Sequence, residues 1–266
     1  MVKFHTPKET IELCIQPYAK ALDIQYPIHL TINNNRTFYA MTSQKEDSHL
    51  LSFDPELAKC SIDSREIFSA HTIRQDENKL SDLVSQLCFL HLSEKIHRIL
   101  SPMYAPHNNQ DLQFLSLFHN STVKIWSDDI LHRQWPDLFV ARYERDNKLT
   151  KEGFEEANDQ SESSEWRTLL FGAAILRANA QRHDYPIQDK KDAFSSIEQY
   201  PRLAKHMTSF IEEWSSLQPI SYNPENDMEN YEKSVKRVVG FACLNAEAVL
   251  KEENGSYQWF LDIKEI

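Results

Sequence analysis

The chain has 266 residues, of which 41% are hydrophobic and 26% are charged, a composition typical of a folded globular protein and not of a disordered chain. Only 4 residues are glycine, which argues against glycine-rich phosphate loops and dinucleotide-binding turns. The net charge of −11, without any strongly basic run, argues against nucleic acid as a partner and favours a basic protein or a small ligand.

The N-terminal residues and the longest apolar runs bear on where the protein resides. The first residues lack the apolar core of a secretory signal, and the apolar runs 169–176 and 238–244 are far shorter than the about 18–20 residues that a membrane helix needs. The 4 cysteines are scattered without a Cys-x-x-Cys pair, which is typical of reduced thiols. We therefore expect a soluble cytoplasmic protein without a signal peptide, a transmembrane segment or membrane partners.

A helix from Thr6 to about Leu22 is the first predicted element. Thr6 is suited to cap this helix, Pro7 to begin it and Glu9 to complete a capping box. Pro17 should kink or shorten it.

Three short strands are predicted next. The first two, at 28–32 and 37–41, flank the polar run 33–36, and asparagine tolerates the positive φ that a tight turn requires. We therefore expect these two strands to form a hairpin. A third strand at 50–53 should end at Asp54.

A long central helix is predicted over 78–100, because apolar residues recur there on most sides of a helix. Pro102 should end it, since proline disfavours helical backbone in the preceding residue. We expect the side chains of this helix that face the core to include Leu83, Leu87, Phe89 and Ile96.

The rest of the chain is predicted to be mainly helical. After a helix or strand at 112–118, a helix at 128–140 should be interrupted near Pro136, and the polar stretch 145–164 should form a loop or a boundary. The remaining predicted elements are helices at 165–182, 202–217 and 227–252 and a last strand at 257–263 that could join the N-terminal sheet.

These elements together predict an α+β fold. We expect a single domain of residues 1–266 with a small N-terminal mixed β-sheet, a central buried helix at about 78–100 and a mainly helical C-terminal half.

Polar residues that can bind metals interrupt the central helix at 91–97, where the sequence reads His-Leu-Ser-Glu-Lys-Ile-His. A buried polar group must be paired or must bind something, because leaving it unsatisfied costs about 1–3 kcal/mol. The Glu94-x-x-His97 spacing, together with the order of helix, strands and central helix, resembles the start of the zincin-type metallopeptidases, whose central helix reads His-Glu-x-x-His.

This resemblance implies roles for particular residues. Glu94 would be the catalytic glutamate that polarises the attacking water, and His97 would be the second histidine ligand of a zinc ion. Ser93 occupies the position of the first histidine, and serine is a poor zinc ligand. A third ligand would come from later in the chain, where Glu165 is our candidate and Glu144 and His183 are alternatives by position.

Two functions follow from these assignments. The first is a zincin-like scaffold whose metal site is degenerate, a pseudoenzyme that acts by binding another protein. The alternative is a metal-dependent, peptidase-like hydrolase that uses Glu94 and His97. The sequence leaves open whether the chain is an enzyme.

Other interpretations of the same residues remain open. His91, Glu94 and His97 could all be structural, as a hydrogen-bonded core histidine, an ion-pair partner and a helix-end cation. Glu94 and His97 could also form half of a di-iron site with Asp129 and His132.

Two longer stretches could be partner surfaces or ordinary structure. The aromatic residues between Trp126 and Tyr143 could line a binding surface or pack in the core. The acidic stretch from Glu152 to Glu165 could attract a basic protein or form a solvated face.

Overall fold

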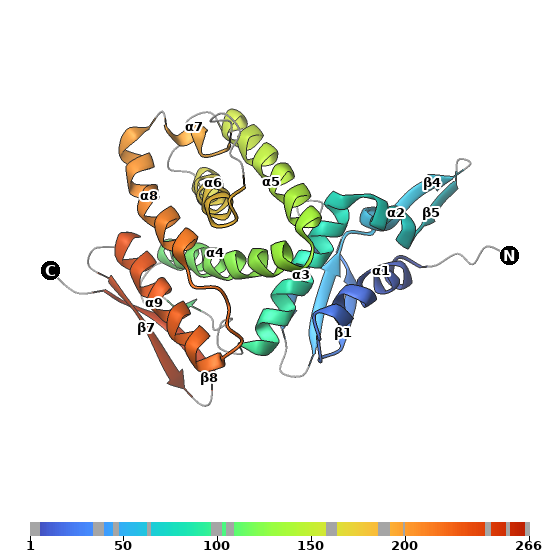
Figure 1. Ribbon diagram of the computed structural model, residues 1–266, viewed down its shortest axis with the longest axis horizontal. Coiled ribbons are helices and arrows are strands. Elements are labelled where there is room, and N and C mark those ends of the chain that lie inside the picture. The colour runs from blue at the N-terminus through green and yellow to red at the C-terminus, as the bar shows by residue number, and fades with distance from the viewer. Residues whose placement is uncertain are drawn as a thin grey trace. The chain divides into compact units, whose positions relative to one another are not determined.

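The computed structural model describes residues 6–33, 40–44, 48–62, 65–96, 103–104, 109–157, 164–185, 192–198, 200–242, 246–253 and 256–263. The chain forms two compact units (Figure 1). Unit 1 comprises residues 1–95 and 127–142, and unit 2 comprises residues 96–126 and 143–266. The fold class is α+β, as expected, with a mixed sheet near the N-terminus and a mainly helical C-terminal half. That the two units form one domain stays a prediction.

The first helix, α1 (Pro7–Ala21), begins with the predicted capping box. The Glu9 backbone N–H donates to Thr6 Oγ1 at 3.3 Å, and the Thr6 backbone N–H donates to Glu9 Oε2 at 2.8 Å. Pro17 lies inside the helix, which continues to Ala21. The helix ends at Ala21, and just beyond it Asp23, with a φ of 53°, allows the N–H of Ile24 to donate to the carbonyl of Ala19 at 3.1 Å. Aspartate thus fills a left-handed position that glycine usually takes.

The N-terminal sheet is mixed, with the strand order β1-β3-β2. Strand β1 (Ile28–Ile32) runs parallel to β3 (His49–Phe53), and β2 (Ala40–Gln44) runs antiparallel to β3. The predicted hairpin of the first two strands is therefore wrong, because the third strand lies between them. Leu51 and Phe53 of β3 are fully buried, as suits the central strand of the sheet. Of the turn expected at 33–36, residues 34–36 lie outside the described residues.

The predicted central helix is α3 (Glu77–Lys95), with the predicted residues 97–100 lying outside the described part of the chain. Leu83 and Leu87 have no exposed surface and Ile96 is 2% exposed, whereas Phe89 is half-buried. The helix packs against β2, α1 and α2. The remaining elements of unit 1 are a 3₁₀ helix η1 (Pro55–Ala58), the hairpin of β4 (Lys59–Ile62) and β5 (Arg65–Phe68), and α2 (Ala70–Gln75).

Two long helices, α4 (Asn109–Gln134) and α5 (Pro136–Glu156), contribute residues to both units. The interruption predicted near Pro136 is present, because α4 ends at Gln134 and Pro136 occupies the first position of α5, where proline is tolerated. Residues 145–156 of the predicted polar loop are instead the second half of α5. They are helical because Lys and Glu are good helix formers, as in the i,i+4 pair of Lys148 with Glu152. Residues 158–163 are not described.

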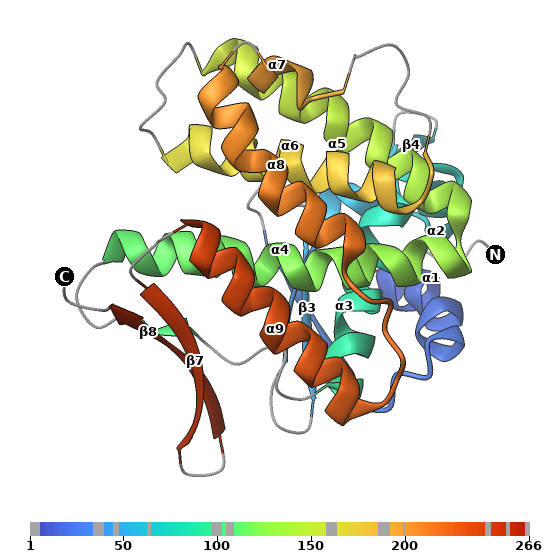
Figure 2. The same cartoon turned by 60° about the vertical axis from the view of Figure 1, so that its left-hand side comes forward.

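Unit 2 consists of packed helices followed by a β-hairpin that lies beside α9 (Figure 2). Helix α6 packs on α8, α8 on α9, and α9 on β7. The elements that belong to unit 2 alone are β6 (Met103–Tyr104), α6 (Ser164–Arg182), α7 (Ser195–Glu198), α8 (Pro201–Ser216), α9 (Pro224–Ala242), β7 (Ala246–Glu253) and β8 (Ser256–Ile263). The predicted helices at 165–182 and 202–217 are thus confirmed as α6 and α8.

The C-terminal segment differs from the prediction in two respects. The helix expected over 227–252 ends at Ala242, and residues 246–253 form β7 instead. The last strand is present as β8, but it pairs with β7 and β6 of unit 2 and not with the N-terminal sheet. Pairing with the strand that immediately precedes it closes a short loop, which costs less chain entropy than a pairing with distant strands.

Candidate functional site

The carboxylate of Glu94, the predicted catalytic group, is held by three hydrogen bonds within unit 1. Glu94 Oε2 accepts from the backbone N–H of Gln25 at 2.8 Å. Glu94 Oε1 accepts from the backbone N–H of Tyr26 at 2.8 Å and lies 2.7 Å from Nε2 of His49. We call these four residues the Glu94 clamp.

The local structure explains why a carboxylate lies here. Gln25 and Tyr26 connect α1 to β1, where neither a helix nor a sheet pairs their backbone N–H groups. A buried N–H without an acceptor would be costly, and the last turn of α3 supplies one in Glu94. The next residue, Pro27, accepts a bond from the N–H of His49 at 2.9 Å. The clamp therefore joins the end of α3 to the beginnings of β1 and β3.

The contact between His49 and Glu94 within the clamp is buried. The side chain of His49 is 0% exposed and that of Glu94 is 5% exposed, and the ring of Tyr26 lies 5.7 Å from that of His49. Nδ1 of His49 has no hydrogen-bond partner among the described residues. Because a carboxylate oxygen only accepts hydrogen bonds, Nε2 of His49 is the donor in its contact with Glu94 Oε1.

Ser93, which occupies the position of the first zincin histidine, is fully buried. Its hydroxyl donates to the backbone carbonyl of Leu90 at 2.7 Å, one turn back in the same helix. Serine commonly bonds in this way inside helices, and the hydroxyl is then directed at its own backbone.

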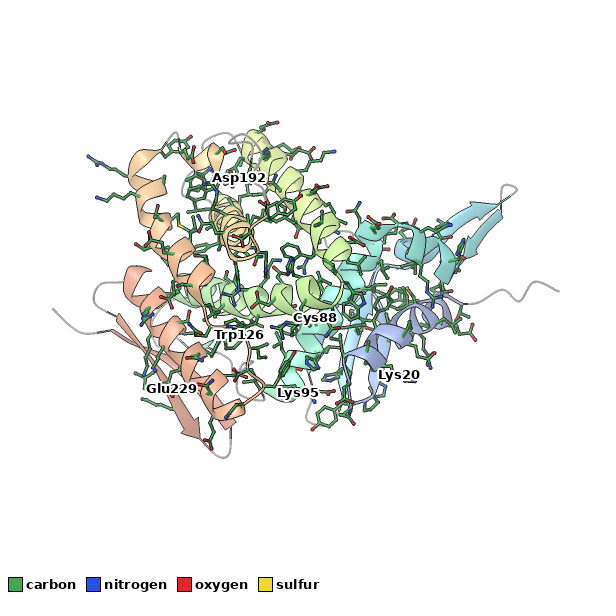
Figure 3. All side chains as sticks on the ribbon, viewed as in Figure 1. Lys20, Cys88, Lys95, Trp126, Asp192 and Glu229 are labelled. Atoms are coloured by element: carbon green, nitrogen blue, oxygen red, sulfur yellow. The ribbon has the colours of Figure 1, made fainter. Side chains whose placement is uncertain are left out.

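His91 is also buried, on the preceding turn of α3. Burial lowers the pKa of His91 below its ordinary value of 6.5, and the nearby charge of Lys95 lowers it further. A hydrogen bond to the backbone of Leu22 and the charges of Glu94 and Asp23 oppose this shift. Lys95 closes the helix and reaches Asp23 at 3.4 Å (Figure 3). His91 is therefore a core histidine that joins α3 to the end of α1.

The two predicted metal ligands lie outside the part of the chain whose side chains the structure describes. His97 lies outside the described residues, and the side chain of Glu165, at the start of α6, is not described either. Among the described residues, no group of three or more His, Cys, Asp or Glu side chains could hold a metal ion. The assignment of His97 and Glu165 as ligands, and of zinc as the metal, stays a prediction.

The other candidate positions have local partners. Glu144 accepts a hydrogen bond from the hydroxyl of Tyr185 at 2.8 Å. Asp129, from the di-iron alternative, is buried, and the ring of His132 packs edge-on against Phe139 at 5.0 Å.

The aromatic stretch from Trp126 to Tyr143 is largely structural. Trp126, Phe139 and Tyr143 are buried, and Trp126 Nε1 donates to the carbonyl of Gln218 at 2.9 Å. Trp135 is half-buried and packs edge-on against Tyr18. Core packing therefore accounts for most of these residues.

The charge pair between Arg177 of α6 and Asp192 was not predicted from the sequence. Asp192 is labelled in Figure 3. The contact is bidentate, with Arg177 Nη2 donating to Asp192 Oδ1 at 2.7 Å, and the guanidinium lies 4.9 Å from the ring centre of Phe194. Asp192 also accepts from the backbone N–H of Ser195, which caps α7. The available signal was the position of Arg177 directly after the apolar run 169–176 of α6. A similar signal was the polar residue His49 at the start of the buried strand β3.

Two further findings concern the whole chain. No helix among the described residues is both long enough and apolar enough to cross a membrane. No protein-family model, curated protein or solved structure matches the chain.

Proposed function

We propose that this protein is a non-catalytic, protein-binding scaffold, in which the Ser93-Glu94 segment of a zincin-like central helix holds the fold together and does not activate water. The partner that the charge of −11 favours is a basic protein. The alternative, a peptidase-like metal hydrolase, would need Glu94 as a general base.

The Glu94 clamp is the observation that carries this proposal. A catalytic glutamate needs an oxygen that faces a water molecule on the metal. In this chain both oxygens of Glu94 accept hydrogen bonds from protein donors, and the side chain is almost fully buried. Such a carboxylate stabilises the fold through its hydrogen bonds. It does not present a free oxygen that could take a proton from a metal-bound water.

Ser93 supports the same conclusion. A zinc ligand must present a lone pair away from its own helix, but the hydroxyl of Ser93 is bonded to Leu90 and has no exposed surface. The two positions that would begin the metal motif therefore both have structural partners.

Replacing Glu94 by Gln separates the two functions. The amide of glutamine would place a donor against one of the donors of Gln25, Tyr26 or His49, so we expect the free energy of unfolding to fall by about 2–4 kcal/mol. If Glu94 were catalytic, Glu94→Gln would leave the free energy of unfolding nearly unchanged and would abolish zinc-dependent hydrolysis. Urea unfolding measures the first outcome, and peptide hydrolysis with added zinc measures the second.

Glu77→Gln is the matched control, because Glu77 is an exposed residue of the same helix. We expect this change to alter the unfolding free energy by less than about 0.5 kcal/mol. Equal stability of the Glu94 and Glu77 variants, or zinc-dependent cleavage of peptides that only Glu94→Gln abolishes, would contradict the proposed scaffold function.

A further inference from the structure

Strand β1 forms one edge of the N-terminal sheet, because the strand order is β1-β3-β2. In a parallel pair, residues that bond to the neighbouring strand alternate with residues that point away from it. The carbonyl of Pro27 accepts from His49, and the N–H of Asn33 donates to Phe53 at 2.8 Å. Odd-numbered residues therefore face β3, and the N–H and C=O groups of Ile28, Leu30 and Ile32 point outward.

Within the part of the chain that the structure describes, these outward backbone groups have no strand neighbour and no hydrogen bond from the open side reaches Ile28, Leu30 or Ile32. As far as the described residues extend, three N–H and three C=O groups thus form an unpaired edge.

Nothing in the sequence of β1 protects this edge. Proteins usually block open edges with lysine, proline or inward-pointing charges, but β1 reads Ile-His-Leu-Thr-Ile, without a charge or a proline. The side chain of Ile32 is 47% exposed and that of His29 is also exposed. An apolar, uncharged edge of this kind is suited to accept another strand.

The Glu94 clamp holds the edge in a rigid form. It fixes Gln25 and Tyr26 just before β1, while the Asn33 bond fixes the residue just after it. In between, the hydroxyls of Thr31 and Ser52 lie 2.8 Å apart and join β1 to β3. A partner strand would meet a preformed edge and would not have to order it first, which lowers the entropy lost on binding.

We propose that the open edge of β1 binds an extended segment of a basic partner protein, which adds to the sheet as a fourth strand. This inference rests on the proposed binding function. The net charge of −11 makes a second copy of the chain an unfavourable occupant and attracts a basic one. The backbone of Ile28, Leu30 and Ile32 would provide the hydrogen bonds, and the apolar side chains would provide contacts for alternate residues of the partner.

The test uses the full chain and a synthetic peptide in which valine and threonine alternate between pairs of lysines at both ends. We expect binding that slows the amide hydrogen exchange of Ile28, Leu30 and Ile32, whereas the amides of His29 and Thr31 are already protected by β3. The same peptide with N-methylated valines should bind at least about tenfold more weakly, because it lacks the backbone donors. A version with glutamates in place of the lysines should also bind more weakly.

Leu30→Pro tests the edge itself, because proline removes one outward N–H and leaves the bonds to β3 in place. We expect the dissociation constant for the lysine peptide to rise at least about tenfold, whereas Leu30→Ala, which keeps the N–H, should raise it less than about threefold. Circular dichroism and thermal melting check that each variant is folded. Should Leu30→Pro fail to fold, Ile32→Pro removes an outward N–H at the exposed end of the strand.

Three outcomes would overturn the inference: no binding of the lysine peptide, equal binding to the Leu30→Pro variant, or a dimer in sedimentation that this substitution dissolves, since the occupant would then be a second copy. None of these changes the expected result for Glu94→Gln. Cleavage of the peptide, in contrast, would contradict the proposed function and not the edge.

Discussion

The carboxylate of Asp192 is almost completely buried, with 3% of its side chain exposed. Its charge is compensated by the ion pair with Arg177. Removing one partner of a buried ion pair leaves the other charge uncompensated, so we expect Asp192→Asn to lower the free energy of unfolding by about 2–4 kcal/mol. Glu198 lies 3.6 Å from the same arginine but is 47% exposed, and Glu198→Gln should cost less than about 1 kcal/mol. Urea unfolding of both variants checks this, and equal losses would show that Asp192 is not the main partner.

His91 predicts how stability depends on pH. Its pKa is lowered in the folded state by burial and by Lys95, so the unfolded chain takes up a proton near pH 6.5 that the folded chain does not. The free energy of unfolding should therefore decrease as the pH falls from about 7.5 to about 5.5, and part of the stability present above the unfolded pKa is lost. The free energy of unfolding of the His91→Gln variant should decrease less over the same pH range. Urea unfolding at several pH values measures the difference, and parallel curves would exclude this role of His91.

At the scale of elements, helix α3 is the core of unit 1, and its interior side chains determine its stability. Leu87 has no exposed surface, and Leu87→Ala should lower the unfolding free energy by about 2–5 kcal/mol through the cavity that it creates. Leu149→Ala is the control, because Leu149 of α5 is 55% exposed and its loss should cost less than about 0.5 kcal/mol. A loss below that level for Leu87→Ala would mean that α3 is peripheral.

Helix ends in this glycine-poor chain use aspartate in left-handed positions. Asp184 follows α6 with a φ of 49°, and the N–H of Tyr185 donates to the carbonyl of Ala180 at 2.9 Å. Glycine has no Cβ penalty there, and Asp184→Gly also removes a negative charge from the C-terminal end of the helix dipole. We expect a gain of about 0.5–1 kcal/mol in thermal or urea unfolding. Asp184→Ala should instead lower stability, and a gain in that variant would rule out the backbone explanation.

At the scale of the whole molecule, the net charge of −11 should speed the arrival of a basic partner. Glu152, Glu155 and Glu156 are exposed near the end of α5, and replacing all three by Gln should slow association with the lysine peptide by about twofold or more and flatten its salt dependence. Stopped-flow measurements at several salt concentrations compare this triple variant with the parent chain, and identical rates would mean that the α5 glutamates do not steer the peptide.

The features that the sequence by itself determined are those governed by residues close together in the chain. The capping box of Thr6 and Glu9 spans one helical turn, and the apolar positions of α3 repeat along one helix, so both could be predicted. The α+β class followed from the same local patterns. The polar residues of 145–156 misled the prediction, because the same charged side chains occur in loops and on exposed helix faces.

Only the tertiary structure decided which distant segments pair. The order β1-β3-β2 depends on burial of Leu51 and Phe53 at the centre of the sheet, which no local pattern specifies. The partners of Glu94 lie 69, 68 and 45 residues away in the sequence, so the motif could indicate that Glu94 was important but not that its oxygens were occupied. Hydrogen bonds form between groups that are close in space. The spacing of two residues in the sequence predicts such closeness only within a helix turn or between adjacent strands.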